Sequence, residues 1–231
     1  MLEDNSTLKA GNERLFMPDS LRDLIEYDRN SMDQYSIRKL ENILELLYTF
    51  PETNKMLNSL KDGLKVKMEI TGGSSSLGEA WYDPIYPPKI GFLREDCITM
   101  ENVLHELLHY YAMYNYVPYR DGVIPACEEY EMRVLTDVIM QKYCANCDFK
   151  YQGMSPDEGL FYQPYIDWIN NLINTSSFDK FLFGIEFKKY GTFCIRRLVT
   201  NDRPISDVLN ENDFNYYIPL LLETFLFDFK R

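Results

Sequence analysis

The stretch TMENVLHELLHYYAMYN, residues 99–115, decides the fold, and it contains both histidines of the 231-residue chain. Apolar side chains occur on nearly every side of this segment, which predicts a buried helix with Thr99 as its N-cap. His105 and His109 are one helical turn apart, so both imidazoles lie on one face and can bind the same cation. Glu106 is rotated roughly a quarter turn away, close enough to hold a water molecule without being a ligand. Because buried imidazoles need polar partners, the segment predicts a metal site.

A small sheet is expected directly before this helix. Apolar and charged residues alternate strictly over residues 65–70, which predicts a strand with one solvated face. Residues 80–82 and 89–93 are predicted to form two further strands, separated by prolines. We therefore expect an α+β fold in which a small, mostly antiparallel sheet packs on the helix of residues 99–115.

Helical spacing predicts additional helices before and after this core. Apolar residues recur at helical spacing over residues 31–50, and Pro51 ends the pattern. Further helices are expected at residues 52–60, 125–143, 165–173 and 213–227, and Ser155 with Glu158 resembles a capping box. We expect a polar lead-in over residues 1–30, a core over residues 31–148 and a mainly helical region over residues 149–231, packed together as a single compact domain.

Composition restricts the partners. The net charge of −12 repels phosphate backbones, so no nucleic acid is expected as a partner. The acidic surface would suit a basic protein substrate, or serve only solubility. The most apolar stretch, residues 216–227, contains Pro219 and Glu223 and is shorter than the about 20 residues that a membrane span needs. We expect a soluble monomer that does not enter a membrane.

Cysteine usage indicates the compartment. The chain has five cysteines without a regular framework, which favours a reducing environment such as the cytoplasm. Cys144 and Cys147 form a CxxC at the end of a predicted helix, where neither a zinc knuckle nor a redox site is expected, so we predict free thiols. The first residues lack the basic flank and apolar run of a classical signal peptide.

The residues 105–109 resemble the HExxH zinc signature of the zincin metallopeptidases. Catalytic zinc usually takes three protein ligands and leaves one position for water. Since no histidine remains, the third ligand must be a carboxylate or a cysteine, and the helix predicted from residue 125 offers Glu128, Glu129 and Glu131.

Helical phase separates these three glutamates. Glu128 shares a stripe with Met132, Leu135 and Ile139 and is therefore expected to face the interior. Glu131 lies at the margin of the stripe, and Glu129 points about a third of a turn away, towards solvent. We predict Glu128 as the third ligand, with Glu129 as the alternative.

HExxH followed by a glutamate on the next helix resembles the gluzincin arrangement of thermolysin and its relatives. The surrounding sequence is similar to a narrower group, the secreted bacterial effector metallopeptidases, of which injected kinase-cleaving proteases are an example. The similarity covers about residues 65 to 140 and is carried, besides HExxH, by Ser74-Ser75-Ser76, Trp81-Tyr82-Asp83-Pro84, residues 90–92, Met100-Glu101-Asn102-Val103-Leu104 and Glu128-Glu129. One feature departs from thermolysin, which places an aspartate four residues after its glutamate ligand. Glu128 is followed at that distance by Met132, and Asp137 is too far along the helix for that role.

The resemblance implies a zincin-like fold and a zinc-dependent endopeptidase. It implies a protein secreted by a specialised system into the host cytosol, where it cleaves a host signalling or cytoskeletal protein. Zn²⁺ would be held by His105, His109 and Glu128, and Glu106 would accept a proton from the attacking water and pass it to the leaving amine. Tyr162 and Tyr165 are candidate oxyanion donors, and the strand near Ile90 could hold an extended substrate by edge pairing.

Two other classes of function stay open. One is a regulatory gluzincin that cleaves a repressor inside its own cell, although no basic helix-turn-helix accompanies the motif. The other is a non-catalytic interaction protein in which the C-terminal helices bind a partner and zinc is structural.

Overall fold

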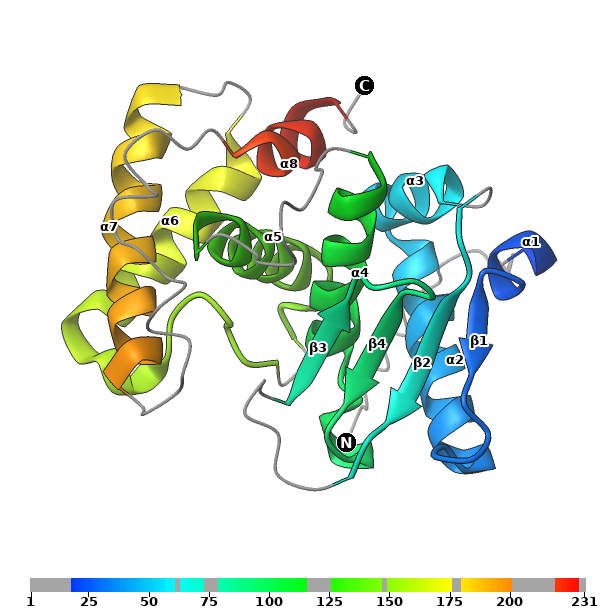
Figure 1. Cartoon of the computed structure of the whole chain (residues 1–231). Coiled ribbons are helices and arrows are strands. Elements are labelled where there is room, and N and C mark those ends of the chain that lie inside the picture. Colours follow the sequence, from blue (N-terminus) through cyan, green and yellow to red (C-terminus); the bar gives the residue numbers. More distant parts are fainter. Residues whose placement is uncertain are drawn as a thin grey trace, which may run out of the picture.

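A mixed sheet of four strands with the order β1-β2-β4-β3 organises the molecule (Figure 1). The computed structural model describes residues 18–60, 63–72, 79–115, 126–146, 149–175, 180–200 and 219–228. The strands are β1 (Ile25–Tyr27), β2 (Val66–Ile70), β3 (Ala80–Asp83) and β4 (Lys89–Phe92). The fold is thus α+β, as expected.

The expectation of a mostly antiparallel sheet is wrong. β1 and β4 both pair with β2 in parallel, and only β3 runs antiparallel to its neighbour β4. β4 inserts between β2 and β3, although β3 comes before it in the sequence. Ile90 therefore lies on a strand that is paired on both sides, and the edge strands of the described sheet are β1 and β3.

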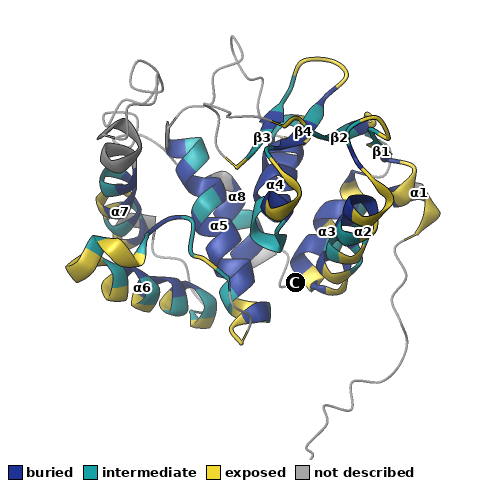
Figure 2. Ribbon diagram, turned by 90° about the horizontal axis from the view of Figure 1, so that it is seen from below, coloured by how far each residue is buried: buried dark blue, intermediate teal, exposed yellow. Residues whose placement is uncertain are grey.

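Three helices lie on one face of the sheet: α2 (Gln34–Thr49), α3 (Pro51–Ser59) and α4 (Met100–Asn115) (Figures 1 and 2). α2 begins at the predicted place because the Asp33 side chain accepts a hydrogen bond from the Ser36 backbone amide at 2.8 Å. Its apolar stripe is fully buried against the sheet side of the molecule, as is the inward row of the strands, formed by Val66, Met68, Ile90 and Phe92. This packing fixes α4 next to β3, where the ring centroids of Tyr82 and Tyr110 lie 6.0 Å apart.

A second group of helices packs on the other side of α4, away from α2 (Figure 2). It comprises α5 (Ala126–Cys144), α6 (Tyr162–Asn174), α7 (Lys180–Thr200) and α8 (Leu220–Glu223), with the short turns Pro156–Phe161 and Thr224–Asp228. An aromatic cluster that includes Tyr165, Trp168 and Tyr190 joins α6 to α7. The buried carboxylate of Glu131 accepts the Leu222 backbone amide at 2.9 Å and so anchors α8 to α5.

Several sequence expectations agree with this structure and others do not. The strands, α2, α3, α4 and the capping box of Ser155 and Glu158 are confirmed. The polar lead-in contains a short helix, α1 (Asp19–Arg22), and strand β1, and α7 was not anticipated. Residues 1–17, Pro125, Cys147 and residues 213–218 lie outside the described part of the chain, while Cys144 is buried. None of the described helices combines the length and the apolar character needed to cross a bilayer.

Gly91 in β4 provides a test of the sheet. A Cβ atom at this position would lie 2.1 Å from the Trp81 ring, which therefore packs directly over the glycine. Gly91→Ala is expected to lower the free energy of unfolding by about 1–3 kcal/mol, because β3 must move to accept the methyl group. Denaturant unfolding measures this change.

Gly184→Ala is the matched control, since a Cβ atom at this position in α7 would meet nothing within 4 Å. It is expected to raise stability by about 0.5–1 kcal/mol, because alanine is the better helix former. Equal effects of the two substitutions would contradict the close packing of Trp81 on Gly91.

Candidate metal centre

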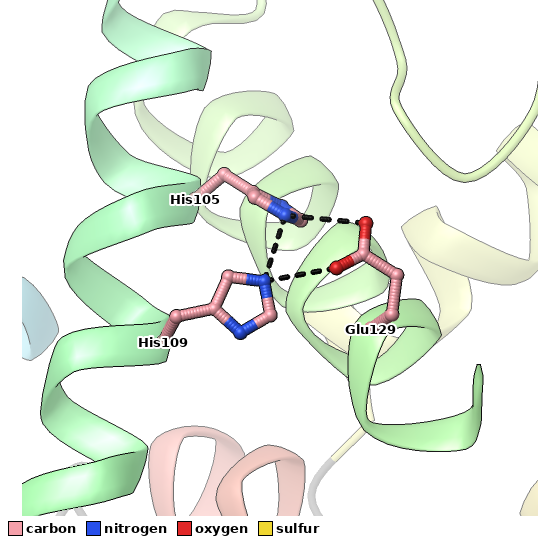
Figure 3. Close-up of side chains that lie close together, drawn as sticks. All are labelled: His105, His109 and Glu129. Atoms are coloured by element: carbon pink, nitrogen blue, oxygen red, sulfur yellow. Dashed lines mark hydrogen bonds and ion pairs between the residues drawn. The ribbon is translucent and has the colours of Figure 1, made fainter. Parts of the chain in front are cut away.

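Helix α4 brings the two histidines together in the interior. Thr99 caps its first turn, where its side-chain oxygen accepts the Asn102 backbone amide at 3.3 Å. The exposed fractions of His105 and His109 are 6% and 2%, so both imidazoles are shielded from water. Their Nε2 atoms point toward one another at 3.0 Å (Figure 3).

The third group of this cluster is Glu129, from the first turn of α5. Its Oε2 lies 3.0 Å from Nε2 of His109, and its Oε1 lies 3.5 Å from Nε2 of His105 (Figure 3). Among the described residues, His105, His109 and Glu129 are the group of side chains whose donor atoms lie close enough together to hold a metal ion. The structure therefore places the alternative, Glu129, rather than the predicted Glu128, against the two imidazoles.

The helical phase was misjudged because α5 is buried on more than one side. The stripe that pointed to Glu128 is indeed buried, at Met132, Leu135 and Ile139, but Tyr130, Val134 and Val138 on other sides are buried as well. An apolar stripe therefore does not define the face of α5 that meets α4. The relevant face carries polar residues at intervals of four, namely Glu129, Arg133 and Asp137.

Glu128 itself lies beside the cluster without joining it. Its Oε2 atom is buried and has no hydrogen-bond partner. Burial raises the pKa of this carboxyl, and the nearby His109 opposes the shift. The Nδ1 atoms of His105 and His109 are likewise buried without a partner, so no thermolysin-type aspartate orients either ring among the described residues.

The geometry of the group fits a zinc ion. Ligand atoms about 2.0–2.1 Å from a tetrahedral zinc are roughly 3.3 Å apart. Nε2 of His109 lies 3.0 Å from both Nε2 of His105 and Oε2 of Glu129, close to this value, and one donor atom from each of the three residues lies within 4.8 Å of the others. Two imidazole nitrogens and one carboxylate oxygen are also the donor set of many catalytic zinc sites.

Burial and neighbouring charges shift the pKa values of all three groups. Burial lowers the pKa of His105 to about 4, so its ring is neutral at physiological pH. Burial alone would raise the pKa of Glu129, but the charge of Arg133 and the two histidines outweigh it and hold this pKa well below its usual range. Burial also opposes protonation of His109, yet the hydrogen bond and charge of Glu129 leave the pKa of its ring raised.

Glu106 lies next to His105 on α4 and is also buried, with an exposed fraction of 5%. Burial raises the pKa of its carboxyl to about 8, and the charge of Glu129 adds to the shift, while His109 and Arg133 oppose it. A carboxyl group that titrates near neutral pH can both accept and return a proton.

Two further residues of α5 that the sequence analysis did not assign to the site, Arg133 and Asp137, support it. Arg133 donates to Glu129 and to the backbone oxygen of Gln152. Asp137 accepts hydrogen bonds from the backbone amides of Gln152 and Gly153 at 2.7 and 2.9 Å, and from the Tyr165 hydroxyl at 2.6 Å. Because the Tyr165 hydroxyl is fully buried and donates to Asp137, Tyr165 is not available as an oxyanion donor. The spacing of Glu129, Arg133 and Asp137 was the signal in the sequence that would have revealed this face of α5.

The described residues thus place two imidazoles and a carboxylate in one buried group, with a further carboxyl, Glu106, on the same helix as the imidazoles. No protein-family model matches the chain, and comparisons with curated proteins and with solved structures give no match.

Proposed function

We propose that the protein is a zinc-dependent endopeptidase that hydrolyses a peptide bond of a protein substrate. The observation that carries the proposal is the convergence of His105, His109 and Glu129 at distances that suit zinc, with Glu106 buried beside them. A purely structural zinc usually has four protein ligands, whereas three protein ligands leave one position for water and substrate. The donor set therefore favours catalysis over a structural role.

Zinc, when bound, supplies an electrophile that activates water near neutral pH and polarises the scissile carbonyl. Glu106 accepts the proton of the attacking water and later donates it to the leaving amine. The direct packing of α4 against α5 holds the donor atoms of His105, His109 and Glu129 in place. The buried position of Glu106 excludes bulk water from the proton transfer.

The edge strand β3 is the proposed contact for the substrate backbone. β3 packs next to α4, and within the described sheet its outer edge has no neighbouring strand. An extended peptide can pair with such an edge through main-chain hydrogen bonds. This assignment moves the proposed pairing from the strand around Ile90 to residues Ala80–Asp83. The sequence resemblance to effector metallopeptidases extends the proposal to a host signalling or cytoskeletal protein as substrate.

Mapping of new protein N-termini tests the proposed activity. Zinc-loaded protein is added to a eukaryotic cytosolic extract, and in parallel the same protein is added after removal of the metal with a chelator. We expect a small set of new N-termini that arises only with the zinc-loaded protein. An extract that gains no such termini, although the protein holds stoichiometric zinc, would instead support a non-catalytic protein with a structural metal.

A further inference from the structure

We propose that Arg133 is the positioning residue of the metal centre and that it restricts Glu129 to a single coordinating oxygen. The proposal rests on the zinc site of the proposed function and adds to it the residue that sets its coordination number. It is carried by the contacts of the guanidinium group and by the way in which that group is itself held.

Two donors of Arg133 converge on one oxygen of Glu129. Nε and Nη2 lie 2.9 and 2.8 Å from Oε1. A carboxylate oxygen has about two acceptor positions, so the guanidinium competes directly with a cation for Oε1. Oε2 lies 3.0 Å from Nε2 of His109, whereas Oε1 lies 3.5 Å from Nε2 of His105. Because Arg133 holds Oε1, which is also the farther of the two oxygens from its imidazole neighbour, Oε2 is the oxygen that the geometry presents to a cation.

Arg133 cannot easily move away from this position. Its third contact, from Nη1 to the backbone oxygen of Gln152, measures 3.1 Å. The backbone of Gln152 and Gly153 is in turn fixed by the carboxylate of Asp137, one turn further along α5. The side chain of Arg133 is thus held between its own helix and a loop that the same helix anchors.

The same loop also reaches the histidine helix. Nε2 of Gln152 donates to Oδ1 of Asn102 at 3.1 Å, and Asn102 lies one turn before His105 on α4. The loop therefore contacts both helices that supply the predicted ligands. This arrangement lets Arg133 set two things: the direction of the Glu129 side chain relative to the two imidazoles, and the carboxylate oxygen that Glu129 presents to them.

A carboxylate that bound through both oxygens would occupy a second position on the metal. By keeping Oε1 occupied, Arg133 reserves that position for water and substrate, as a catalytic site requires. The guanidinium group of Arg133 carries several N–H groups in one plane and can direct more than one of them at Oε1. The ammonium group of a lysine would offer a single charged point.

Cobalt(II) in place of zinc tests the proposal, because four-coordinate cobalt absorbs visible light several-fold more strongly than five-coordinate cobalt. Metal-free protein is titrated with Co²⁺ in the wild type, in Arg133→Met and in Arg133→Lys. We expect the wild type to give the strong four-coordinate spectrum. Arg133→Met is expected to lose intensity several-fold, because Oε1 is released and joins the metal. Arg133→Lys is expected to resemble Arg133→Met, and because it keeps the positive charge it is the variant that best preserves the fold.

The outcomes separate this role from the proposed function. Identical spectra in all three proteins would overturn the positioning role and leave the metal site intact. A wild-type spectrum in Arg133→Lys together with a weakened one in Arg133→Met would also overturn it, since charge alone would then suffice. A wild type that binds no cobalt would overturn the metal site itself.

Lys142→Met is the matched control. Lys142 is another partly buried cation of α5, and it pairs with the buried carboxylate of Glu52, away from the histidines. Its loss removes a comparable ion pair from the same helix, and we expect an unchanged cobalt spectrum. A loss of intensity in this control as large as that in Arg133→Met would show a general effect on α5 and would overturn the proposal.

Discussion

Glu106→Gln is expected to lower the rate of peptide cleavage by about 10²–10⁴-fold while the bound metal is retained. The amide of glutamine has nearly the same shape as the carboxyl group but cannot accept a proton from water. The substitution should leave the fold intact, since burial already favours the uncharged form of this side chain. Because Glu106 is outside the group of donor atoms around the metal, metal content should not change.

Two measurements on the same preparation check this expectation. Metal analysis gives the zinc content per chain, and the rate of cleavage is followed on a substrate found by N-terminal mapping. Glu101→Gln is the control, because Glu101 lies in the first turn of the same helix and is only partly buried. Undiminished cleavage by Glu106→Gln would remove Glu106 from the proposed mechanism.

Glu129→Gln is expected to weaken zinc binding strongly, because it replaces a proposed metal ligand. The loss of a residue that only hydrogen-bonds to a ligand already lowers metal affinity by about 10–100-fold, and we expect a larger loss here. The substitution removes the negatively charged donor nearest to both Nε2 atoms. Glu128→Gln, one residue earlier, is the internal comparison and should change zinc affinity little, because its carboxylate does not belong to the group of donors.

Competition with a chelator of known affinity measures both variants. Thermal unfolding of the metal-free proteins shows whether either substitution alters the fold by itself. The reverse pattern, with zinc lost in Glu128→Gln and kept in Glu129→Gln, would return the third ligand to the residue that the apolar stripe of α5 suggested.

The sequence predicts helix α4 well because its signal is local. The spacing of His105 and His109, the cap at Thr99 and the apolar content of the segment all act within one helix. Strand β2 is predictable for the same reason, since its alternation reflects one face in the core and one in solvent.

The arrangement of the strands was less predictable because it depends on contacts between distant segments. β1 has three residues, too few to show an alternating pattern. The sequence therefore does not reveal this strand or its parallel pairing with β2. The insertion of β4 between β2 and β3 likewise pairs β4 with a strand that does not precede it directly in the sequence. The choice between Glu128 and Glu129 failed on a related point, since a helix buried on several sides has no single apolar stripe from which to read its orientation.

The loop that holds Arg133 connects the core expected over residues 31–148 to the C-terminal region expected to pack on it. A chain shortened to residue 148 would keep every side chain proposed to touch the metal. It would nevertheless lose the backbone of Gln152 and Gly153 and the hydroxyl of Tyr165, which are the hydrogen-bond donors of the buried Asp137 carboxylate. The smallest unit able to assemble this proposed centre is therefore larger than the two helices that carry it, and the loop of residues 152–153 and α6 belong to the same folded unit as α4 and α5.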